Sequence, residues 1–351
     1  MKPLIFILES KDRFATICVK YVNRNGDRIY VNTPFRILRS EWSATLERPA
    51  NIYEKANKEL NDQLNFLKIE LGEAVRKRLK LNIDITKRWL IGQILTHSKQ
   101  NKPRYVKRDI LYYISQYTEA RKDYLELSTL TRYKVFYELF YRFEGYCQQR
   151  IFLKDINESV IDMFYEFGLK EGYSENTIRK SIGFLKTVMT YYHSKGKVKE
   201  FPSINERPLS RQSTSSKTVI TLNETELYLI YHTPVSQELE VVKDWLMISC
   251  YSGQRVSDFM KFHHTMIRNI GGKQCIDFIQ HKTRKRILLP LHPVILEILA
   301  KYEGNFPPKI NPRKYNSEVK KIAKASSINQ RIEGKKCVNH RVKSGLYENG
   351  N

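Results

Sequence analysis

A short segment in the last third of the chain combines residue types suited to holding a phosphate. It reads Cys250-Tyr-Ser-Gly-Gln-Arg-Val-Ser-Asp-Phe259 and follows an apolar stretch that we predict to be a helix ended by Gly253. Arg255 then stands near the first turn of another predicted helix, with Ser257 and Asp258 close by. A guanidinium offers two parallel donors to a phosphate, and free amides at a helix start add to the attraction. The segment therefore predicts an anion-binding arginine.

A second basic segment, Gln280-His-Lys-Thr-Arg-Lys-Arg286, lies between two short runs of β-forming residues at 275–280 and 286–291. We predict a β-hairpin with Lys282 in its turn, where a lysine can enter a DNA groove beside an arginine-bound phosphate. Taken singly, each feature has a plainer interpretation, because charge runs usually solvate a turn and a helix-start arginine usually caps or pairs. The functional interpretation needs the rest of the chain.

Four predicted helices with short connections precede this region and indicate an all-α bundle. They run from Arg108 to Leu125, from a cap at Ser128 or Thr129 through Phe143, from Glu158 to Lys170, and from Ser174 through Tyr192. We expect their tyrosines to pack a core or the edge of the domain; these are Tyr112, Tyr113, Tyr117, Tyr124, Tyr137 and Tyr141.

The beginning of the chain is different in pattern. Two β-rich runs within residues 13–34 flank an Asn/Gly turn and predict a hairpin, and a long amphipathic helix follows from about Asn51 to Leu81. Polar, proline-containing stretches at 99–103 and 201–217 are typical of linkers. We therefore predict a mixed α+β, multidomain fold: a first domain at 1–98, a helical domain at 104–200, a linker at 201–217 and an α/β domain at 218–351.

The net charge narrows the class of binding partner. The 351 residues hold 61 Lys and Arg against 37 Asp and Glu, and this net charge of +24 favours a polyanion, with double-stranded DNA first. A membrane is the rival, but the apolar run Leu4 to Leu8 is too short to export or anchor the chain. Five scattered cysteines without a C-x-x-C pair indicate neither a zinc module nor a disulfide framework. We predict a cytoplasmic protein without metal or cofactor.

In this order and context, the two basic motifs resemble those of the tyrosine recombinase (phage integrase) family. Ser252 to Asp258 is similar to its first catalytic box, usually T-G-x-R-x-S-[DE], and the His281 motif ending in Leu-Pro-Leu is similar to its hairpin-lysine motif, x-K-T-x-K…I-P-L. The segments Leu127–Tyr133 and Gly172–Lys180 resemble the core-DNA-binding domain of Bacteroides-type integrases. The N-terminal hairpin, Trp42 and the long helix resemble their arm-DNA-binding domain, so the likeness covers nearly the whole chain.

The resemblance implies three domains: a β-hairpin arm-binding domain, an all-α SAM-like core-binding domain and an α/β catalytic domain. It implies transesterification, in which a tyrosine attacks the scissile phosphate, arginines and a histidine stabilise the phosphorane, and a lysine protonates the 5′-oxygen. Arg255 matches the first arginine, Lys282 the lysine, and Asp258 an acidic residue that supports the arginine. It also implies tetramers on DNA. The expected DNA contacts are Lys217, Arg284, Lys285, Arg286, Arg132, Arg179 and Lys180.

The family's second box, H-x-x-R on a helix, and its nucleophilic tyrosine should follow a segment like Lys335 to Tyr347. The motif His340-Arg341-Val342-Lys343 ends in lysine within a polar stretch, and Tyr347 has no preceding box, so we identify no nucleophile. We expect an incomplete catalytic domain, truncated before these motifs, that binds DNA without cleaving it and assembles weakly.

Two functions remain open from the sequence. The first is a site-specific recombinase or integrase of a mobile element, inactive as this chain. The alternative is a non-catalytic DNA-binding remnant that regulates or competes with a full-length integrase. Strand exchange requires the distal motifs, whereas occupancy of a site requires only basic surfaces. An RNA-binding protein is a weaker third possibility, because neither an RNP-type strand nor a G-x-x-G loop stands out.

Overall fold

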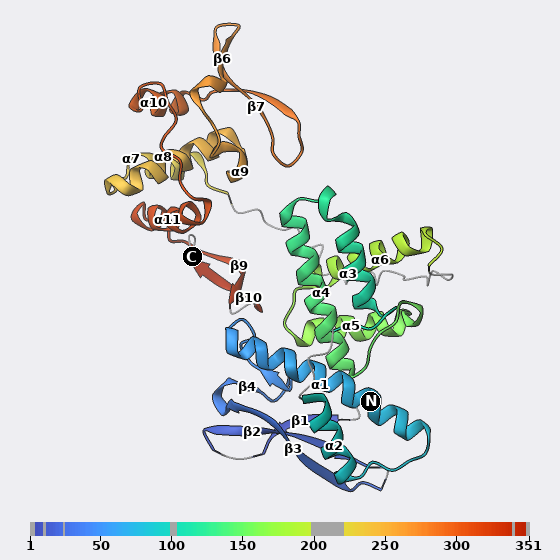
Figure 1. Ribbon diagram of the computed structural model, residues 1–351. Helices are drawn as coiled ribbons and strands as arrows, with labels where there is room; N and C mark the ends of the chain where they lie inside the picture. The colour runs from blue at the N-terminus through green and yellow to red at the C-terminus, as the bar shows by residue number, and fades with distance from the viewer. Residues whose placement is uncertain are drawn as a thin grey trace. The chain divides into compact units, whose positions relative to one another are not determined.

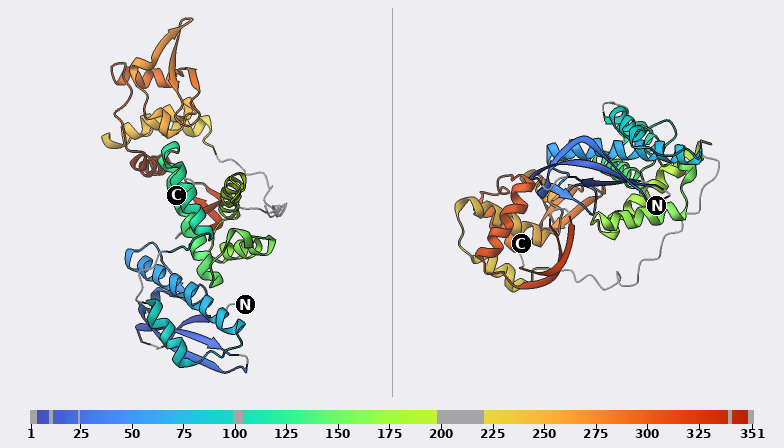
Figure 2. Two further views of the ribbon diagram at one scale, coloured as in Figure 1. Left: turned by 45° about the vertical axis from the view of Figure 1, so that its right-hand side comes forward. Right: turned by 90° about the horizontal axis from the view of Figure 1, so that it is seen from below.

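The computed structural model describes residues 4–9, 12–23, 25–98, 104–197, 221–338 and 341–348, and the side chains up to residue 332 (Figures 1 and 2). The chain divides into two compact units, with the division near residue 208. This division falls in the predicted linker at 201–217, which lies outside the described residues, as does the predicted linker at 99–103. The two units are treated in turn.

The first unit begins with a three-stranded antiparallel sheet, coloured blue in Figure 1. Its strands in sheet order are β1 (Leu4–Leu8), β2 (Phe14–Val22) and β3 (Arg28–Leu38). The predicted hairpin is confirmed as β2 and β3, and the side chain of Asn23 accepts a hydrogen bond from the Asp27 backbone in the turn. Strand β1 was not predicted, because five residues are too few to show a period.

Two helices pack on this sheet. Helix α1 (Lys55–Lys80) confirms the predicted long helix, and α2 (Lys87–Ser98) is an addition. Both contribute to one apolar cluster with alternate residues of β1 and β2, as expected for a strand whose side chains point in turn to opposite faces. The cluster includes Leu4, Phe6, Val19, Leu67, Leu71 and Leu90. A short ribbon, η1 (Arg39–Glu41), β4 (Trp42–Ser43) and β5 (Arg48–Pro49), leads from the sheet to α1.

Four helices complete the first unit and confirm the predicted bundle. They are α3 (Ile110–Arg121), α4 (Leu127–Cys147), α5 (Glu158–Lys170) and α6 (Glu175–Ser194), with short 3-10 turns η2 (Lys122–Tyr124) and η3 (Leu153–Asp155). The predicted cap at Ser174 is confirmed, because its side chain accepts from the Thr177 backbone. Stacked and edge-on aromatic rings fill the core, as between Phe140 and Phe164.

Two predictions for the bundle are wrong. Helix α4 begins at Leu127 and not after Ser128 or Thr129, because the Glu126 carbonyl already accepts from the backbone N–H groups of Thr129 and Leu130. Tyr124 is 85% exposed, because it lies in the turn η2 between two helices and not on a helix face. Tyr117 and Tyr141 are buried as predicted.

The second unit is mixed α/β. In chain order it contains α7 (Glu224–His232), α8 (Gln237–Ser252), α9 (Val256–Phe259), η5 (His264–Met266), β6 (Ile267–Ile270), β7 (Lys273–Ile279), β8 (Arg286–Pro290), α10 (Pro293–Lys301), α11 (Pro312–Ala325), β9 (Arg331–Val338) and β10 (Arg341–Glu348). Strands β6, β7 and β8 form an antiparallel sheet in that order, and β9 pairs with β10. The helix α8 and the hairpin β7–β8 were predicted, whereas α11 and the pair β9–β10 were not.

The core of the second unit is built around Trp245 of α8, which stacks on Phe306 and donates from its indole nitrogen to the Pro308 carbonyl at 2.9 Å. Helix α7 begins with a capping box, in which Asn223 and Glu226 each bind the backbone of the other. In the described part of the chain, no helix is long and apolar enough to cross a membrane. The predicted mixed α+β, multidomain fold class is therefore confirmed.

Candidate nucleic-acid interface

Arg255 stands where the chain leaves one helix and enters the next. Gly253 ends α8 in the left-handed region with a φ of 63°, as predicted, and Arg255 is the N-cap residue of α9. Its side chain is exposed and has no polar partner among the described residues. Because α9 has only four residues, few aligned peptide dipoles sum there. The predicted help from helix amides is therefore small, and the predicted anion binding rests on the guanidinium.

The loop between β7 and β8 holds Lys282, as predicted. The Gln280 backbone N–H donates to the Lys285 carbonyl, and the Arg284 N–H donates to the Gln280 carbonyl, both at 2.9 Å. The loop closes with Arg284 in the left-handed region, at a φ of 57°. Lys282 and Lys285 are exposed, and the ammonium group of neither has a polar partner in the described part of the chain.

Two hydrogen bonds join this loop to the arginine segment. The Oδ1 atom of Asp258 accepts from the His281 backbone N–H at 2.8 Å, and the Oε1 atom of Gln254 accepts from the Gln280 Nε2 atom at 2.9 Å. In each bond, one residue lies close in sequence to Arg255 and its partner lies close in sequence to Lys282. The structure thus brings together the two segments that the sequence singled out.

Asp258 contacts the hairpin and not the side chain of Arg255. The resemblance implies a carboxylate that supports the arginine, but Asp258, only 4% exposed, forms no ion pair with Arg255 and binds the hairpin backbone instead. Its other oxygen, Oδ2, and the buried Ser252 hydroxyl have no hydrogen-bond partner within the described residues. Asp258 therefore binds the hairpin, and its support of Arg255 stays a prediction.

Arg286 also differs from the other predicted contacts. Its Nε and Nη2 atoms donate to the two carboxylate oxygens of Asp277 at 2.8 and 2.5 Å, and Arg268 approaches the same carboxylate at 3.0 Å. These hydrogen bonds, with the Arg286 bonds as the largest cause, hold the pKa of Asp277 below its usual value. Arg286 is exposed, yet its guanidinium already has a bidentate anionic partner, so a phosphate would have to compete with Asp277.

The remaining residues predicted to contact DNA lie in the first unit or outside the residues that the structure describes. Arg132 is exposed on α4, and Arg179 and Lys180 are half-buried and exposed on α6; none has a polar partner among the described residues. Lys217 lies outside the described residues. The sequence analysis missed Gln254 and Gln280, because a neutral amide carries no signal until a fold pairs it with another.

One part of the chain matches a known protein family, and longer parts of it are similar to solved structures. Residues 109–207 match the family model of the phage integrase SAM-like domain. No curated protein matches the chain. Among solved structures, the chain is similar to a lambda integrase tetramer bound to a Holliday junction, with 15% identity and a TM-score of 0.46, over 93% of this chain and 85% of that chain. It is also similar to the XerH site-specific recombinase bound to a palindromic difH substrate, with 14% identity and a TM-score of 0.47, over 80% and 83%.

The family match covers the four-helix bundle that begins with the N-cap residue Asp109 and continues through α6. This part of the chain matches a phage integrase SAM-like domain. The recognition made from Leu127–Tyr133 and Gly172–Lys180 is therefore confirmed.

Proposed function

We propose that this chain is a DNA-binding protein of the site-specific recombinase or integrase type, from a mobile element, with tyrosine-type transesterification as the chemistry of its family. One observation carries the proposal. The chain has a phage integrase SAM-like domain, and two of its exposed side chains, those of Arg255 and Lys282, have no polar partner among the described residues. The two segments that carry these cations are joined by hydrogen bonds.

The arrangement is suited to a phosphodiester. The guanidinium of Arg255 can take two phosphate oxygens side by side and stabilise negative charge that develops on them. The ammonium of Lys282, carried by an exposed loop, can reach the groove and donate a proton to a leaving 5′-oxygen. Gln254 and Asp258 would act by holding the lysine loop against the arginine segment.

The partner is double-stranded DNA; full-length relatives would assemble on it as tetramers, like the lambda integrase complex, whereas we expect this chain to assemble weakly. Binding should weaken steeply as salt rises, because each neutralised phosphate releases counterions. Fluorescence anisotropy with a labelled duplex tests this, and an affinity that is flat from low to physiological salt would contradict the proposal. For substitutions of the unpaired cations Arg255 and Lys282, Lys321→Ala is a matched control, because Lys321 is exposed but already pairs with Glu318. We expect it to change DNA affinity less.

For strand cleavage we assign no nucleophile and no second arginine among the 351 residues, so we expect the chain to occupy DNA without cutting it. The test is a nicked duplex that traps covalent intermediates, incubated with the chain and run on a denaturing gel. A protein–DNA adduct would contradict this part of the proposal and leave the binding part intact.

The same observation favours a second candidate function, a non-catalytic regulator that competes with a full-length integrase. Adding the chain to a recombination reaction of such an integrase separates the two. Inhibition that disappears in the Arg255→Ala variant supports competition for phosphate contacts, and no inhibition at saturating amounts of the chain contradicts it.

A further inference from the structure

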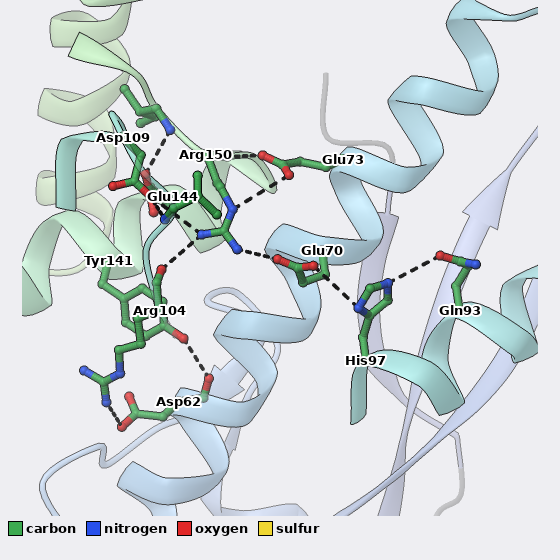
Figure 3. A network of polar contacts seen from close by, with 12 residues as sticks. Asp62, Glu70, Glu73, Gln93, His97, Arg104, Asp109, Tyr141, Glu144 and Arg150 are labelled. Atoms are coloured by element: carbon green, nitrogen blue, oxygen red, sulfur yellow. Dashed lines mark hydrogen bonds and ion pairs between the residues drawn. The ribbon is translucent and has the colours of Figure 1, made fainter. Parts of the chain in front are cut away.

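A buried polar network lies where the N-terminal sheet domain (residues 4–98) meets the SAM-like domain (104–197), as Figure 3 shows. At its centre is Arg150, only 8% exposed, in the segment after α4. Its guanidinium pairs with Glu70 and Glu73 of α1, and with Asp109, which caps α3. The Arg150 backbone N–H also donates to a Glu73 oxygen at 2.9 Å. One arginine therefore holds carboxylates from both domains.

The helices approach closely on both sides of this network. A Cβ atom on Gly72 of α1 would lie 2.0 Å from the Gln148 carbonyl oxygen, and one on Gly145 of α4 would lie 1.8 Å from the Asn65 side chain. Arg76 of α1 donates to the Gln148 and Cys147 carbonyls at 2.5 and 2.8 Å, which satisfies acceptors at the end of α4. The two glycines are thus required by contact between domains.

The side-chain amide of Gln148 pairs with the backbone of β1 in the way that a neighbouring strand would. It is 1% exposed and ends α4 in the left-handed region, with a φ of 55°. Its amide accepts from the Leu4 N–H at 3.1 Å and donates to the Leu4 carbonyl at 2.6 Å. Elsewhere along this contact between the two domains, the seam, Arg48 donates two bonds to Glu171 at 3.1 and 2.6 Å.

We propose that Arg150 and Gln148 are positioning residues that fix the sheet domain on the SAM-like domain, so that the two engage DNA as one body and not as modules on a tether. Separating them would leave buried carboxylates, an arginine and backbone groups without partners, which is costly. The part that concerns DNA rests on the proposed function. It predicts that the two domains read DNA segments at one fixed spacing.

The first test needs no DNA. Phe164 of α5 packs among Phe140, Phe143 and Phe167 of the SAM-like core, so Phe164→Ala weakens that domain without touching the sheet. In the full chain, amide hydrogen exchange should then accelerate in β2 by the same factor as in α6. Unchanged protection in β2 would overturn the proposal. If Phe164→Ala does not fold, Phe164→Leu gives the same comparison with a smaller loss.

A matched pair of glycine variants tests the seam itself. Gly72→Ala forces a methyl group against the Gln148 backbone, whereas Gly92→Ala in α2 meets nothing within 4 Å. We expect Gly72→Ala to abolish the shared response of β2 and α6 to Phe164→Ala, and Gly92→Ala to leave it intact. Identical behaviour of the two variants would overturn the proposal.

The second test uses selection from duplexes of random sequence. Wild type should enrich sequences with two recognition blocks at a single spacing, and Gly72→Ala should broaden the distribution of spacings. Blocks at variable spacing in wild type would overturn the one-body proposal. No enrichment at all would contradict the proposed function instead, and the amide exchange result would still decide whether the domains are joined.

Discussion

Arg150 and Arg255 show two uses of the same side chain. Arg150 is buried at the domain seam and is surrounded by Glu70, Glu73 and Asp109. Arg255 is exposed beside the lysine loop, and no described carboxylate neutralises it. In a chain with 61 Lys and Arg, most cations say little about a binding site. The informative ones are those that the fold holds in place but leaves without an anion.

The carboxylates of the two regions differ in the same way. At the seam, burial is the largest influence and raises the pKa of Glu144 well above its usual value, and that of Asp109 in the same direction. At the hairpin, hydrogen bonds from Arg286 are the largest influence and lower the pKa of Asp277. Burial at the seam therefore disfavours the charged form of these acids, whereas at the hairpin the exposed Arg286 favours the charged form of Asp277.

The largest expected effect is on the seam. Arg150→Met removes the cation but leaves several buried carboxylates, and we expect the free energy of unfolding to fall by about 3–5 kcal/mol. Urea unfolding followed by circular dichroism measures this, with Arg132→Met as the exposed control on α4. Equal losses in both variants would show that the seam network contributes no more than a surface charge.

The next effect depends on pH and concerns Glu144, which is fully buried in α4 and accepts from the Ile151 N–H at 2.9 Å. Because its folded pKa is raised, the folded state keeps a proton that the unfolded state has lost. Stability therefore falls as pH rises from the unfolded value, about 4.3, towards the folded pKa, by at most about 1.4 kcal/mol per pH unit.

Glu144→Gln should flatten that part of the stability profile, because glutamine does not titrate. Urea midpoints at a series of pH values test this, and Glu119→Gln, exposed on α3, is the control expected to leave the slope unchanged. A slope in Glu144→Gln equal to that of wild type would show that another group titrates in this window.

The sequence predicted the parts of the fold that depend on local signals. The capped, periodic helices α5 and α6 and the turn between β2 and β3 were all foreseen, because each carries its own signal within a few residues. Helix α2 was missed, since only Leu90 and Ile94 of its residues are buried and no strong period results. Short β1 was missed for want of length.

The candidate site was predictable in its charges but not in its supports. Arg255 and Lys282 follow from motifs that a single sequence displays, and the loop position of Lys282 follows from the hairpin. The Gln254–Gln280 bond, the contact of Asp258 with the His281 backbone and the capture of Arg286 by Asp277 depend on tertiary geometry. The seam around Arg150 was hidden for the same reason, because its partners lie on separate segments.

For the exposed region we expect an effect on DNA and little on stability. Arg255→Ala should raise the Kd for a duplex about tenfold and reduce the salt dependence by about one counterion, with the free energy of unfolding changed by less than about 0.5 kcal/mol. Arg286→Ala should raise the Kd less, because Asp277 already holds that guanidinium. If both variants weaken binding equally, pairing with a carboxylate does not decide which cations of this chain contribute to DNA affinity.

The smallest effect would sharpen the role of the amide pair. If the Gln254–Gln280 bond holds the lysine loop against the arginine segment, Arg255→Ala and Lys282→Ala should be non-additive in DNA affinity, by about 0.5–1 kcal/mol. Gln280→Ala should bring that coupling close to zero while each cation still contributes by itself. Gln274→Ala, an exposed glutamine on β7, is the control and should keep the coupling. Additive losses in wild type would mean that the two cations meet DNA independently, each at its own phosphate.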